Sequence, residues 1–337
     1  MYKIECTKCS WAELAELVDA QDSDSCVRKD FGVQVPGSAL IIKKILVPNS
    51  SPKYLVLISS RSNSLVKSFR QLHTPKGRRE AGLFLLEGTH LVMEAVGTSY
   101  PLETLCATPQ WWERHGELGE QASNLATRVE MVTAEVLQAM ATTVQPDGVV
   151  ATAPSREELS RQNLSRQLYP EELRSPPTPK STANFLGIAG ETLQDPGNVG
   201  TMIRTAVATG VQGLWLSRDS VDGENPKVLR ASAGQWFRLP MVSAPDLVEV
   251  VRSLQAQGIQ VVATNPRAEL TYWQVDFTSP TLILLGNEGA GLSNDLLALA
   301  DRQVQIPLLG GVESLNVAIS SAVMLYEAQR QRQQFSS

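Results

Sequence analysis

The fold is decided by the stretch LILLGNEGAGL, which occupies residues 282–292. Four consecutive aliphatic residues are followed at once by a polar, glycine-rich segment. A short apolar run of this kind is typical of a strand that is buried on both faces of a parallel sheet. The stretch therefore predicts a buried strand that ends in a loop, where Gly286 permits close approach of a bulky ligand such as an adenosyl group.

The same pattern recurs on both sides of this strand. Apolar strand candidates lie at residues 184–190, 213–217, 239–243, 259–264, 281–287 and 302–307. Helix-like stretches lie between them, at residues 200–209, 226–235, 245–257, 292–299 and 314–330. This alternation predicts a mainly parallel α/β sheet covered on both faces. Ligands of such sheets bind beyond the carboxyl ends of the strands, so informative residues should follow strands directly.

The remainder of the chain divides by composition into three further parts. Residues 1–53 are expected to be an N-terminal extension without a core of its own, and residues 54–152 a smaller α/β domain. Residues 153–182 are rich in Ser, Arg, Gln and Pro and predict a linker to the main domain at 183–332. Within the smaller domain we expect helices at 64–72 and 89–96, and strands at 83–86, 102–107 and 149–152.

Composition restricts the class of protein. The net charge of the 337 residues is −5, so any RNA-binding surface must be a local patch. The four cysteines do not form a disulfide framework for a chain of this length, and no apolar run reaches membrane length. We therefore expect a soluble, cytoplasmic protein. Cys6 and Cys9 form a CxxC with only Cys26 nearby, so metal or redox chemistry there is the less favoured interpretation.

The first of three polar motifs is QDPGNVG at residues 194–200, followed by a helix that contains Arg204. Proline and two glycines indicate a tight turn, and the N-terminus of the next helix presents free N–H groups to an anion such as phosphate. Arg204 is expected about one turn into that helix, where it can bind phosphate bidentately. A plain strand-to-helix loop with a surface arginine is the alternative interpretation.

The second motif is the loop that follows the strand at 282–285. Glu288 stands at the end of this strand, where its carboxylate can orient a hydroxyl or a partner side chain. The loop lacks the GxGxxG fingerprint of dinucleotide-binding proteins, and a lone glycine-rich loop is weak evidence. Thr264, at the end of its own predicted strand, is a further candidate for the same pocket.

The third motif is IPLLGGVESLNVA at residues 306–318. Ser314 can serve as the N-cap of the last helix. Asn316 then falls just inside that helix and is not needed for capping, which leaves it available for a pocket. Leu308 and the residues that follow it predict an apolar, glycine-containing loop suited to an adenine ring.

In order and context, these motifs resemble those of the SpoU family of RNA 2′-O-ribose methyltransferases, within the SPOUT superfamily. The resemblance rests on Asn198 with Arg204, Asn287–Gly289 and Ser314–Asn316, and it covers roughly residues 184–330. It implies a trefoil-knotted α/β domain, which is an exception to the general rule against knots. It also implies S-adenosylmethionine as the cofactor, and a homodimer whose active site is completed across the interface.

The resemblance also assigns residues to the pocket. Its catalytic positions correspond to Asn198, Arg204, Glu288, Ser314 and Asn316. The cofactor would be surrounded by Gly286, Ile306 and Leu315, to which we add Leu308 and Thr264.

Methyl transfer from a sulfonium is an in-line displacement that requires no metal, and positioning is a large part of its catalysis. We expect Arg204 to hold a phosphate and to stabilise negative charge on the 2′-oxygen. Its role as proton acceptor stays open, because free arginine titrates above about 12. Glu288 is expected to orient Arg204 or a hydroxyl.

The smaller domain resembles the substrate-binding domain of the same family, which has a ribosomal-protein-like α/β fold. The similarity rests on residues 60–63, Lys67, Arg78, Phe84, Glu87-Gly88 and Leu91. Every charged residue between Arg61 and Arg79 is basic, which predicts an RNA phosphate footprint. Its candidates are Arg61, Asn63, Lys67, Arg70, Arg78 and Arg79. A solvated helix face is the alternative interpretation.

Two functions of other classes are the alternatives. A non-catalytic RNA-binding factor with a decayed methyltransferase half would have lost motif residues, yet all three motifs are intact. A nucleotide-binding oxidoreductase would need GxGxxG and an acidic residue after the second strand in the expected arrangement. Among RNA substrates, the two-domain layout favours 23S ribosomal RNA by analogy, with transfer RNA as the alternative.

Overall fold

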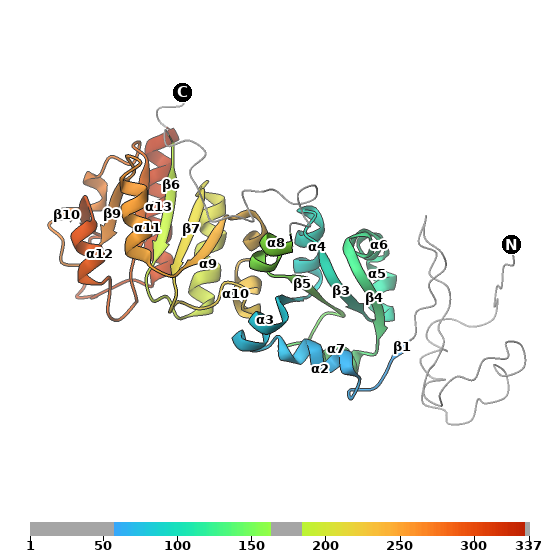
Figure 1. The fold of residues 1–337 in the computed structure, drawn as a ribbon. Coiled ribbons are helices and arrows are strands. Elements are labelled where there is room, and N and C mark those ends of the chain that lie inside the picture. Colours follow the sequence, from blue (N-terminus) through green and yellow to red (C-terminus); the bar gives the residue numbers. More distant parts are fainter. Residues whose placement is uncertain (1–56, 163–183, 334–337) are drawn as a thin grey trace, which may run out of the picture. The chain divides into compact units, whose positions relative to one another are not determined.

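A computed structural model describes residues 57–162 and 184–333, which belong to one compact unit. We call residues 57–162 the N-terminal lobe and residues 184–333 the C-terminal lobe (Figure 1). The predicted extension at 1–53, with Cys6, Cys9 and Cys26, lies outside the described residues, as does the predicted linker from residue 163 to 182.

The C-terminal lobe is built on a parallel sheet of seven strands, as the alternation of strands and helices predicts. The strands are β6 (Leu186–Gly190), β7 (Gly213–Ser217), β8 (Met241–Ala244), β9 (Gln260–Thr264), β10 (Leu270–Thr271), β11 (Thr281–Leu285) and β12 (Arg302–Gln305). Their order is β10-β12-β9-β11-β6-β7-β8, and every pairing is parallel. All six predicted strands are confirmed, and the short edge strand β10 was not predicted.

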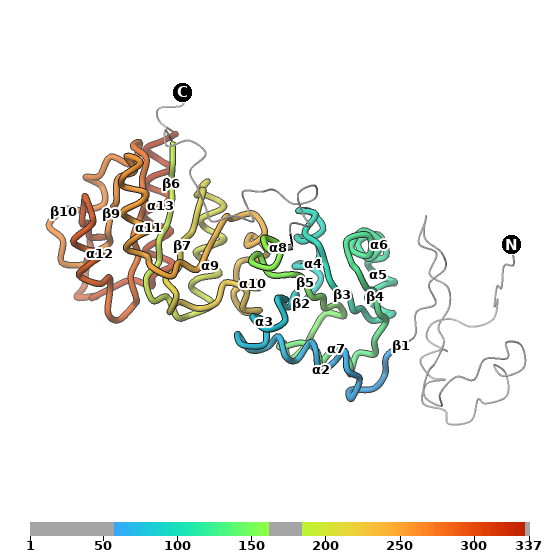
Figure 2. Tube along the Cα trace, viewed as in Figure 1, coloured from blue at the N-terminus to red at the C-terminus, as the bar shows by residue number. Residues whose placement is uncertain are grey.

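Helices cover both faces of this sheet, which confirms the predicted layers (Figure 2). They are α9 (Pro196–Ala208), α10 (Pro226–Ala231), α11 (Leu247–Gln255), α12 (Asn294–Leu299) and α13 (Val317–Gln333), with the 3-10 turns η2 (Gln235–Arg238) and η3 (Tyr272–Gln274). Successive residues of a strand point to opposite faces. In β11, Leu282 and Leu284 therefore pack with α11 and α12, whereas Ile283 and Leu285 pack with α9 and α13.

The N-terminal lobe contains a mixed five-stranded sheet in the order β1-β4-β3-β5-β2. The strands are β1 (Leu57–Ile58), β2 (Leu83–Glu87), β3 (Leu102–Ala107), β4 (Ala126–Val132) and β5 (Val149–Pro154). The helices are α2 (Ser64–Gln71), α3 (Pro75–Ala81), α4 (Thr89–Gly97), α5 (Pro109–Arg114), α6 (Gly116–Leu125), α7 (Ala134–Met140) and α8 (Arg156–Gln162). The predicted helices at 64–72 and 89–96 and the predicted strands β2, β3 and β5 are confirmed. Residues 153–162, assigned to the linker, instead form the end of β5 and α8.

The two lobes share a hydrophobic core. Phe84 and Tyr100 of the N-terminal lobe contact Trp236 of the C-terminal lobe, with ring centroids 5.0 and 5.8 Å away. Arg156 of α8 lies 4.1 Å above the Trp236 ring and donates to the carbonyl of Leu239 at 2.8 Å. These contacts explain why residues that follow β5 are structured although their composition resembles a linker.

No helix within the described ranges has both the length and the apolar character needed to cross a membrane.

Candidate active site

The three polar motifs meet in a hydrogen-bonded cluster at the carboxyl edge of the C-terminal sheet. The Asn198 side-chain amide donates to the Glu288 carboxylate. The Asn316 side-chain amide donates to the Asn198 side-chain oxygen at 2.9 Å. We call these three residues the Asn198 cluster. One residue of each motif is thus present, although the motifs are 90 and 118 residues from Asn198 along the chain.

Asn198 is placed by the first turn of α9. The Asp195 side chain is the N-cap and accepts from the Asn198 backbone N–H at 3.0 Å, and Pro196 occupies the first helical position. Proline is favoured there because its missing N–H would have no helical partner in any case. The helix therefore begins four residues earlier than the predicted start at residue 200. This early start brings the Asn198 side chain to the helix N-terminus, beside the second and third motifs.

Arg204 occupies a different position from the one the sequence suggested. Because α9 begins at Pro196, Arg204 lies more than two turns into the helix rather than one. It is about 120° around the helix axis from Asn198, given 3.6 residues per turn. Its side chain is exposed, and within the described residues it has no hydrogen bond or ion pair. The expected contact between Arg204 and Glu288 is absent from this chain, and Glu288 bonds to Asn198 instead.

The loop after β11 is held by Asn287, whose role sequence reasoning missed. Its side-chain oxygen accepts from the backbone N–H groups of Gly289 at 2.9 Å and Ala290 at 3.0 Å. Its amide donates to the Thr192 carbonyl at 2.9 Å, which ties the loop to the segment before α9. An Asn that closes a turn on its own following residues is a recognisable Asx signal. The loop that carries Glu288 is therefore rigidly supported.

Gly286 makes a close approach, but to its own chain rather than to a ligand. A Cβ atom at Gly286 would lie 2.2 Å from the Gly291 carbonyl carbon and 2.4 Å from the Leu292 nitrogen. The glycine is thus required because the loop returns across the end of β11. We expected the missing side chain to make room for a cofactor, but the structure shows that it makes room for the returning loop.

Asn316 is the cap of the last helix, contrary to the prediction that Ser314 fills that role. Its side-chain oxygen accepts from the N–H groups of Ala318 at 2.9 Å and Ile319 at 3.4 Å. The helix starts at Val317, three residues later than predicted, which leaves Ser314 in the exposed loop before it. Capping uses the oxygen of Asn316, so its amide is free to hold Asn198. One residue therefore fixes both the helix start and the cluster.

A cleft of about 390 Å³ opens beside the cluster. It is lined by Leu193, Gln194, Asp195, Asn198, Asn287, Glu288, Gly289 and Val317. Carboxylates and amides dominate this lining, and Lys227 lies 3.8 Å from the carboxylate of Asp195 at the rim. Such a surface provides hydrogen-bond donors and acceptors for the hydroxyls of a sugar. Among the described residues, no three His, Cys, Asp or Glu side chains are grouped so that they could hold a metal ion.

Three of the residues assigned to the cofactor stand at the ends of three neighbouring strands. Thr264 ends β9, Gly286 follows β11 and Ile306 follows β12, and β9 pairs with both other strands. The Thr264 hydroxyl donates to the Leu284 carbonyl at 3.0 Å. Leu308 and Leu315 are half-buried in the segment between β12 and α13. Apolar side chains and backbone groups near the carboxyl edge of a parallel sheet are of a kind that suits an adenosyl group.

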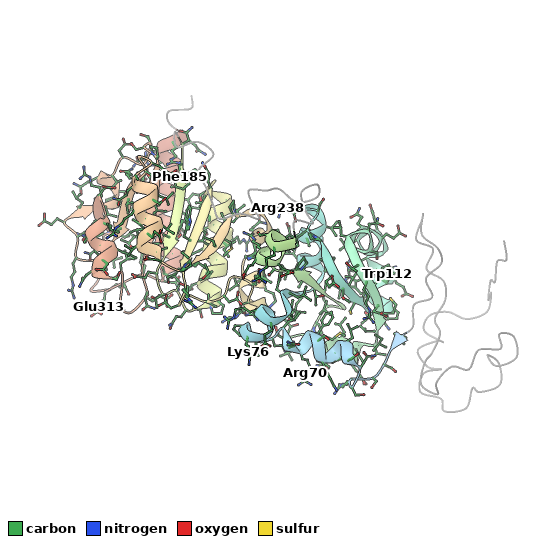
Figure 3. All side chains as sticks on the ribbon, viewed as in Figure 1. Arg70, Lys76, Trp112, Phe185, Arg238 and Glu313 are labelled. Atoms are coloured by element: carbon green, nitrogen blue, oxygen red, sulfur yellow. The ribbon has the colours of Figure 1, made fainter. Side chains whose placement is uncertain are left out.

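The basic residues of the N-terminal lobe separate into two groups. Lys67 and Arg70 on α2, and Arg61 and Arg79, are exposed, and Figure 3 shows Arg70 and Lys76 at the surface of α2 and α3. Asn63 is the N-cap of α2 and accepts from the Leu65 N–H at 2.9 Å.

Arg78 is corrected from an RNA contact to an internal one. It is only 2% exposed, and its guanidinium bonds to Asp222 at 2.6 Å and to the Leu72 carbonyl at 2.9 Å.

Comparison with known proteins yields two family matches. A model of the SpoU rRNA Methylase family matches residues 186–326, which contain all three motifs. A model of the MRM3-like substrate binding domain matches residues 63–151, which contain the exposed basic residues Lys67, Arg70 and Arg79.

Individual relatives span both lobes. An uncharacterized tRNA/rRNA methyltransferase of Synechocystis sp. is 45% identical over 82% of this chain and 94% of its own length. The 23S rRNA (guanosine(2553)-2′-O)-methyltransferase of Bacillus subtilis is 31% identical over 80% of this chain and 97% of its own. The AdoMet-bound rRNA methyltransferase from Sinorhizobium meliloti has a TM-score of 0.69 at 30% identity, covering 81% of this chain and 97% of that structure.

Proposed function

The chain belongs to the SpoU rRNA methylase family, and on this premise we propose that it methylates a ribose 2′-hydroxyl of 23S ribosomal RNA. The family is one of RNA ribose 2′-O-methyltransferases, which confirms the resemblance drawn from the three motifs. The observation that carries the proposal within this molecule is the Asn198 cluster, where one residue from each motif meets. Its site of action is inferred to be the cytoplasm, where ribosomal RNA is made.

S-adenosylmethionine is the cofactor, and when bound it supplies an electrophilic methyl group. The residues at the ends of β9, β11 and β12 fit this group in chemistry, since they combine apolar side chains with backbone donors and acceptors. Ile306, Leu308 and Leu315 would provide the apolar part. Thr264 supports this edge by its bond to Leu284, and Gly286 by its packing against the returning loop.

The Asn198 cluster orients the ribose in this proposal. Asn198 holds Glu288 and Asn316 at once, so its own position is fixed before RNA binds. Preorganised groups stabilise a transition state without reorganisation at the moment of reaction. Glu288 has a second carboxylate oxygen that can accept from a sugar hydroxyl, and Ser314 lies exposed in the adjacent loop.

Arg204 is proposed to act across a subunit interface. Its exposed side chain points away from the Asn198 cluster of its own chain, so it is available to the pocket of a second copy. Ile319 and Tyr326 support such an interface. They are seven residues apart on one face of α13 and are 51% and 54% exposed. A homodimer would cover this apolar stripe.

A trefoil knot is proposed for the C-terminal lobe. In the sheet, β12 lies beside β9, on one side of β11. The segment after β12 must lead from there to α13, which packs against α9.

Substrate and chemistry are tested together on the purified full-length protein. Tritium from labelled S-adenosylmethionine is expected in 23S ribosomal RNA transcripts and not in bulk transfer RNA. A 2′-O-methylated ribose blocks alkaline cleavage of the next phosphodiester, so the label should appear in alkali-resistant dinucleotides. Label confined to transfer RNA would favour the alternative substrate. Label that alkali releases in mononucleotides would place the methyl group on a base and refute ribose methylation.

Replacing Arg204 tests its assigned role. Arg204→Ala is expected to abolish methyl transfer to RNA while it leaves the affinity for S-adenosylmethionine, measured by calorimetry, largely intact. The reason is that Arg204 belongs to the RNA side of the site, remote from the strand ends that hold the cofactor. Arg252→Ala, an exposed arginine on α11, is the matched control. Near-normal transfer by Arg204→Ala would refute the role.

The proposed dimer interface is tested by introducing a charged residue at its centre. Tyr326→Arg should convert the dimer into a monomer in light-scattering measurements, because it places a cation in an apolar contact. Ser253→Arg, at an exposed position of α11, serves as a charge-matched control. A wild-type protein that is monomeric at micromolar concentration would exclude the dimer and the shared site.

A further inference from the structure

Glu87-Gly88 is a motif that the methyltransferase site does not use. Glu87 ends β2 in the N-terminal lobe, and its side chain is 1% exposed. A buried carboxylate requires compensating partners. It accepts from the Thr142 backbone N–H at 2.6 Å and forms an ion pair with Arg230 of the other lobe. Arg230 also donates to the Thr142 hydroxyl at 3.0 Å, so its guanidinium is bound by two residues of the N-terminal lobe.

Arg230 is joined in turn to the helix that carries Asn198. It lies on α10, which packs on α9 at Gly200. A Cβ atom at Gly200 would lie 2.4 Å from the Ala231 Cβ atom and 2.7 Å from the Val228 carbonyl oxygen. The two helices therefore touch backbone to backbone, only two residues beyond Asn198. Because no space is left between the two helices at this contact, a shift of α10 toward α9 must also move the start of α9.

A second, partly buried ion pair connects the RNA side of the N-terminal lobe to the segment that leads into the same helix. Arg78 on α3 bonds to Asp222, which precedes α10, and also to the Leu72 carbonyl at the end of α2. The exposed basic residues lie on or beside α2 and α3. The surface expected to hold RNA and the helix that holds Asn198 are thus fixed to a common element, α10.

We propose that Glu87 and Arg230 are positioning residues, which fix the RNA-binding lobe on α10 and so align the bound RNA with the Asn198 cluster. The aromatic contacts between Phe84, Tyr100 and Trp236 already hold the lobes together. Apolar contact is non-directional, whereas a hydrogen-bonded ion pair has one geometry. The Glu87–Arg230 pair therefore sets the alignment between the lobes together with the Arg78–Asp222 pair and the Arg156–Leu239 hydrogen bond, and the apolar contacts provide the adhesion.

The test compares Arg230→Gln, Glu87→Gln and the double variant in the full-length protein. This inference rests on the proposed function, because its first readout is methyl transfer to 23S ribosomal RNA. At a temperature well below melting, Arg230→Gln should lower the single-turnover rate at saturating RNA by at least about tenfold. Affinity for S-adenosylmethionine should not change. The double variant should be no slower than Arg230→Gln, since both changes break one contact.

Two further variants separate alignment from stability. Arg230→Lys keeps the charge and should recover part of the rate. Arg128→Gln breaks the exposed Arg128–Glu130 pair within the N-terminal lobe and should leave the rate unchanged. Wild-type rates in Arg230→Gln, or additive losses in the double variant, would overturn the inference. A loss of cofactor affinity that parallels a lower melting temperature would also overturn it, since that pattern denotes a purely structural role.

A distance measurement keeps the inference testable even if the enzyme proves to have another RNA substrate. Spin labels at Ser68→Cys and Gln257→Cys report the separation of the lobes, after Cys6, Cys9 and Cys26 are replaced by serine. Both positions are exposed, one in each lobe. Arg230→Gln should broaden the distribution of distances between the labels. An unchanged distribution would refute the positioning role, whereas absent methylation of 23S RNA by the wild type would refute only the proposed substrate.

Discussion

Asn198 is the side chain that connects the other residues of the site. It joins Glu288 to Asn316, and each of these residues is set in place by a local turn of its own. An amide can donate and accept at the same time, which neither an acid nor an aliphatic residue of similar size can do. Removal of this amide would free two partners, in addition to losing the contact that we propose between Asn198 and the ribose.

We therefore expect Asn198→Ala to lower the rate of methyl transfer by about 100-fold, because a small misplacement of reacting groups is enough for such a loss. The melting temperature should change little, since Asn198 is half-exposed at a helix end. Thr201→Ala is the matched control, because that exposed hydroxyl bonds only to the Gly197 carbonyl of its own helix. Equal rates for the two variants would remove Asn198 from the site.

At this scale, the sequence predicted the members of the site better than their roles. Asn198, Glu288 and Asn316 were each identified from a motif, and they do meet. The prediction that Ser314, and not Asn316, caps the last helix was wrong, and so was the predicted position of Arg204. Both depend on where a helix begins. A helix start is decided by one local hydrogen bond, such as that of Asp195, and hydrophobic periodicity does not report it.

Among the elements, the loop after β11 is the one whose shape the site depends on. Its return across β11 leaves no room at Gly286, where an added Cβ would meet backbone atoms that cannot rotate away. Gly289, in the same loop, has only the Asn287 side-chain oxygen at 3.5 Å from an added Cβ, an ordinary contact. The two glycines therefore provide a matched pair within one loop.

Gly286→Ala is expected to lower the free energy of unfolding by about 1–3 kcal/mol through overpacking and to weaken S-adenosylmethionine binding. Gly289→Ala should leave both quantities nearly unchanged. Chemical denaturation and calorimetry on the two variants measure these effects. If Gly286→Ala were as stable as Gly289→Ala, the loop would not cross β11 as closely as described.

Strands were predicted according to how fully they are buried. The strands β6, β9 and β11 at the centre of the C-terminal sheet each contain a buried run of mostly apolar residues, and all three were located from the sequence. The edge strand β10 consists of Leu270 and Thr271, and Leu270 is 37% exposed. In the N-terminal lobe, β4 carries Arg128 and Glu130 and was missed. Partly exposed strands have no continuous apolar run, so the signal that identifies buried strands is absent.

The molecule as a whole depends on contacts that no local pattern encodes. Arg78 and Asp222 are 144 residues apart, and their ion pair turned a predicted RNA contact into part of the boundary between the lobes. In a segment whose charged residues are all basic, the sequence alone does not distinguish the basic residue that is buried from those that are exposed. The distinction arises only when the two lobes are packed together, because Asp222 then becomes available to Arg78 and not to its neighbours.

The boundary between the lobes also contains a carboxyl group that should make stability depend on pH. Burial, and next the negative charge of Asp222, raise the pKa of Glu224 from 4.5 to about 7. The Arg156 backbone N–H donates to Glu224 at 3.1 Å and opposes this rise only in part. In the unfolded chain the group should titrate near its ordinary value, so folded and unfolded states bind different numbers of protons between pH 4.5 and 7.

The sign of the effect follows from proton linkage. Within this range the folded protein keeps a proton that the unfolded chain has lost, so the free energy of unfolding decreases as the pH rises. The loss is complete above about pH 7, where Glu224 is ionised in both states. Its size should be on the order of 1–3 kcal/mol, since one pKa unit corresponds to about 1.4 kcal/mol. Glu224→Gln keeps an acceptor for Arg156 but cannot ionise, and should remove this loss.

Urea denaturation at pH 5 and pH 8 measures the prediction as a difference between two proteins. The wild type should lose more stability than Glu224→Gln over that interval, and the variant should be the more stable of the two at pH 8. The comparison cancels the contributions of all other ionisable groups, which both proteins share. Glu130→Gln, on the exposed Arg128 pair, should behave as the wild type does. Parallel pH profiles for the wild type and Glu224→Gln would mean that Glu224 titrates normally and that the boundary between the lobes is open to water.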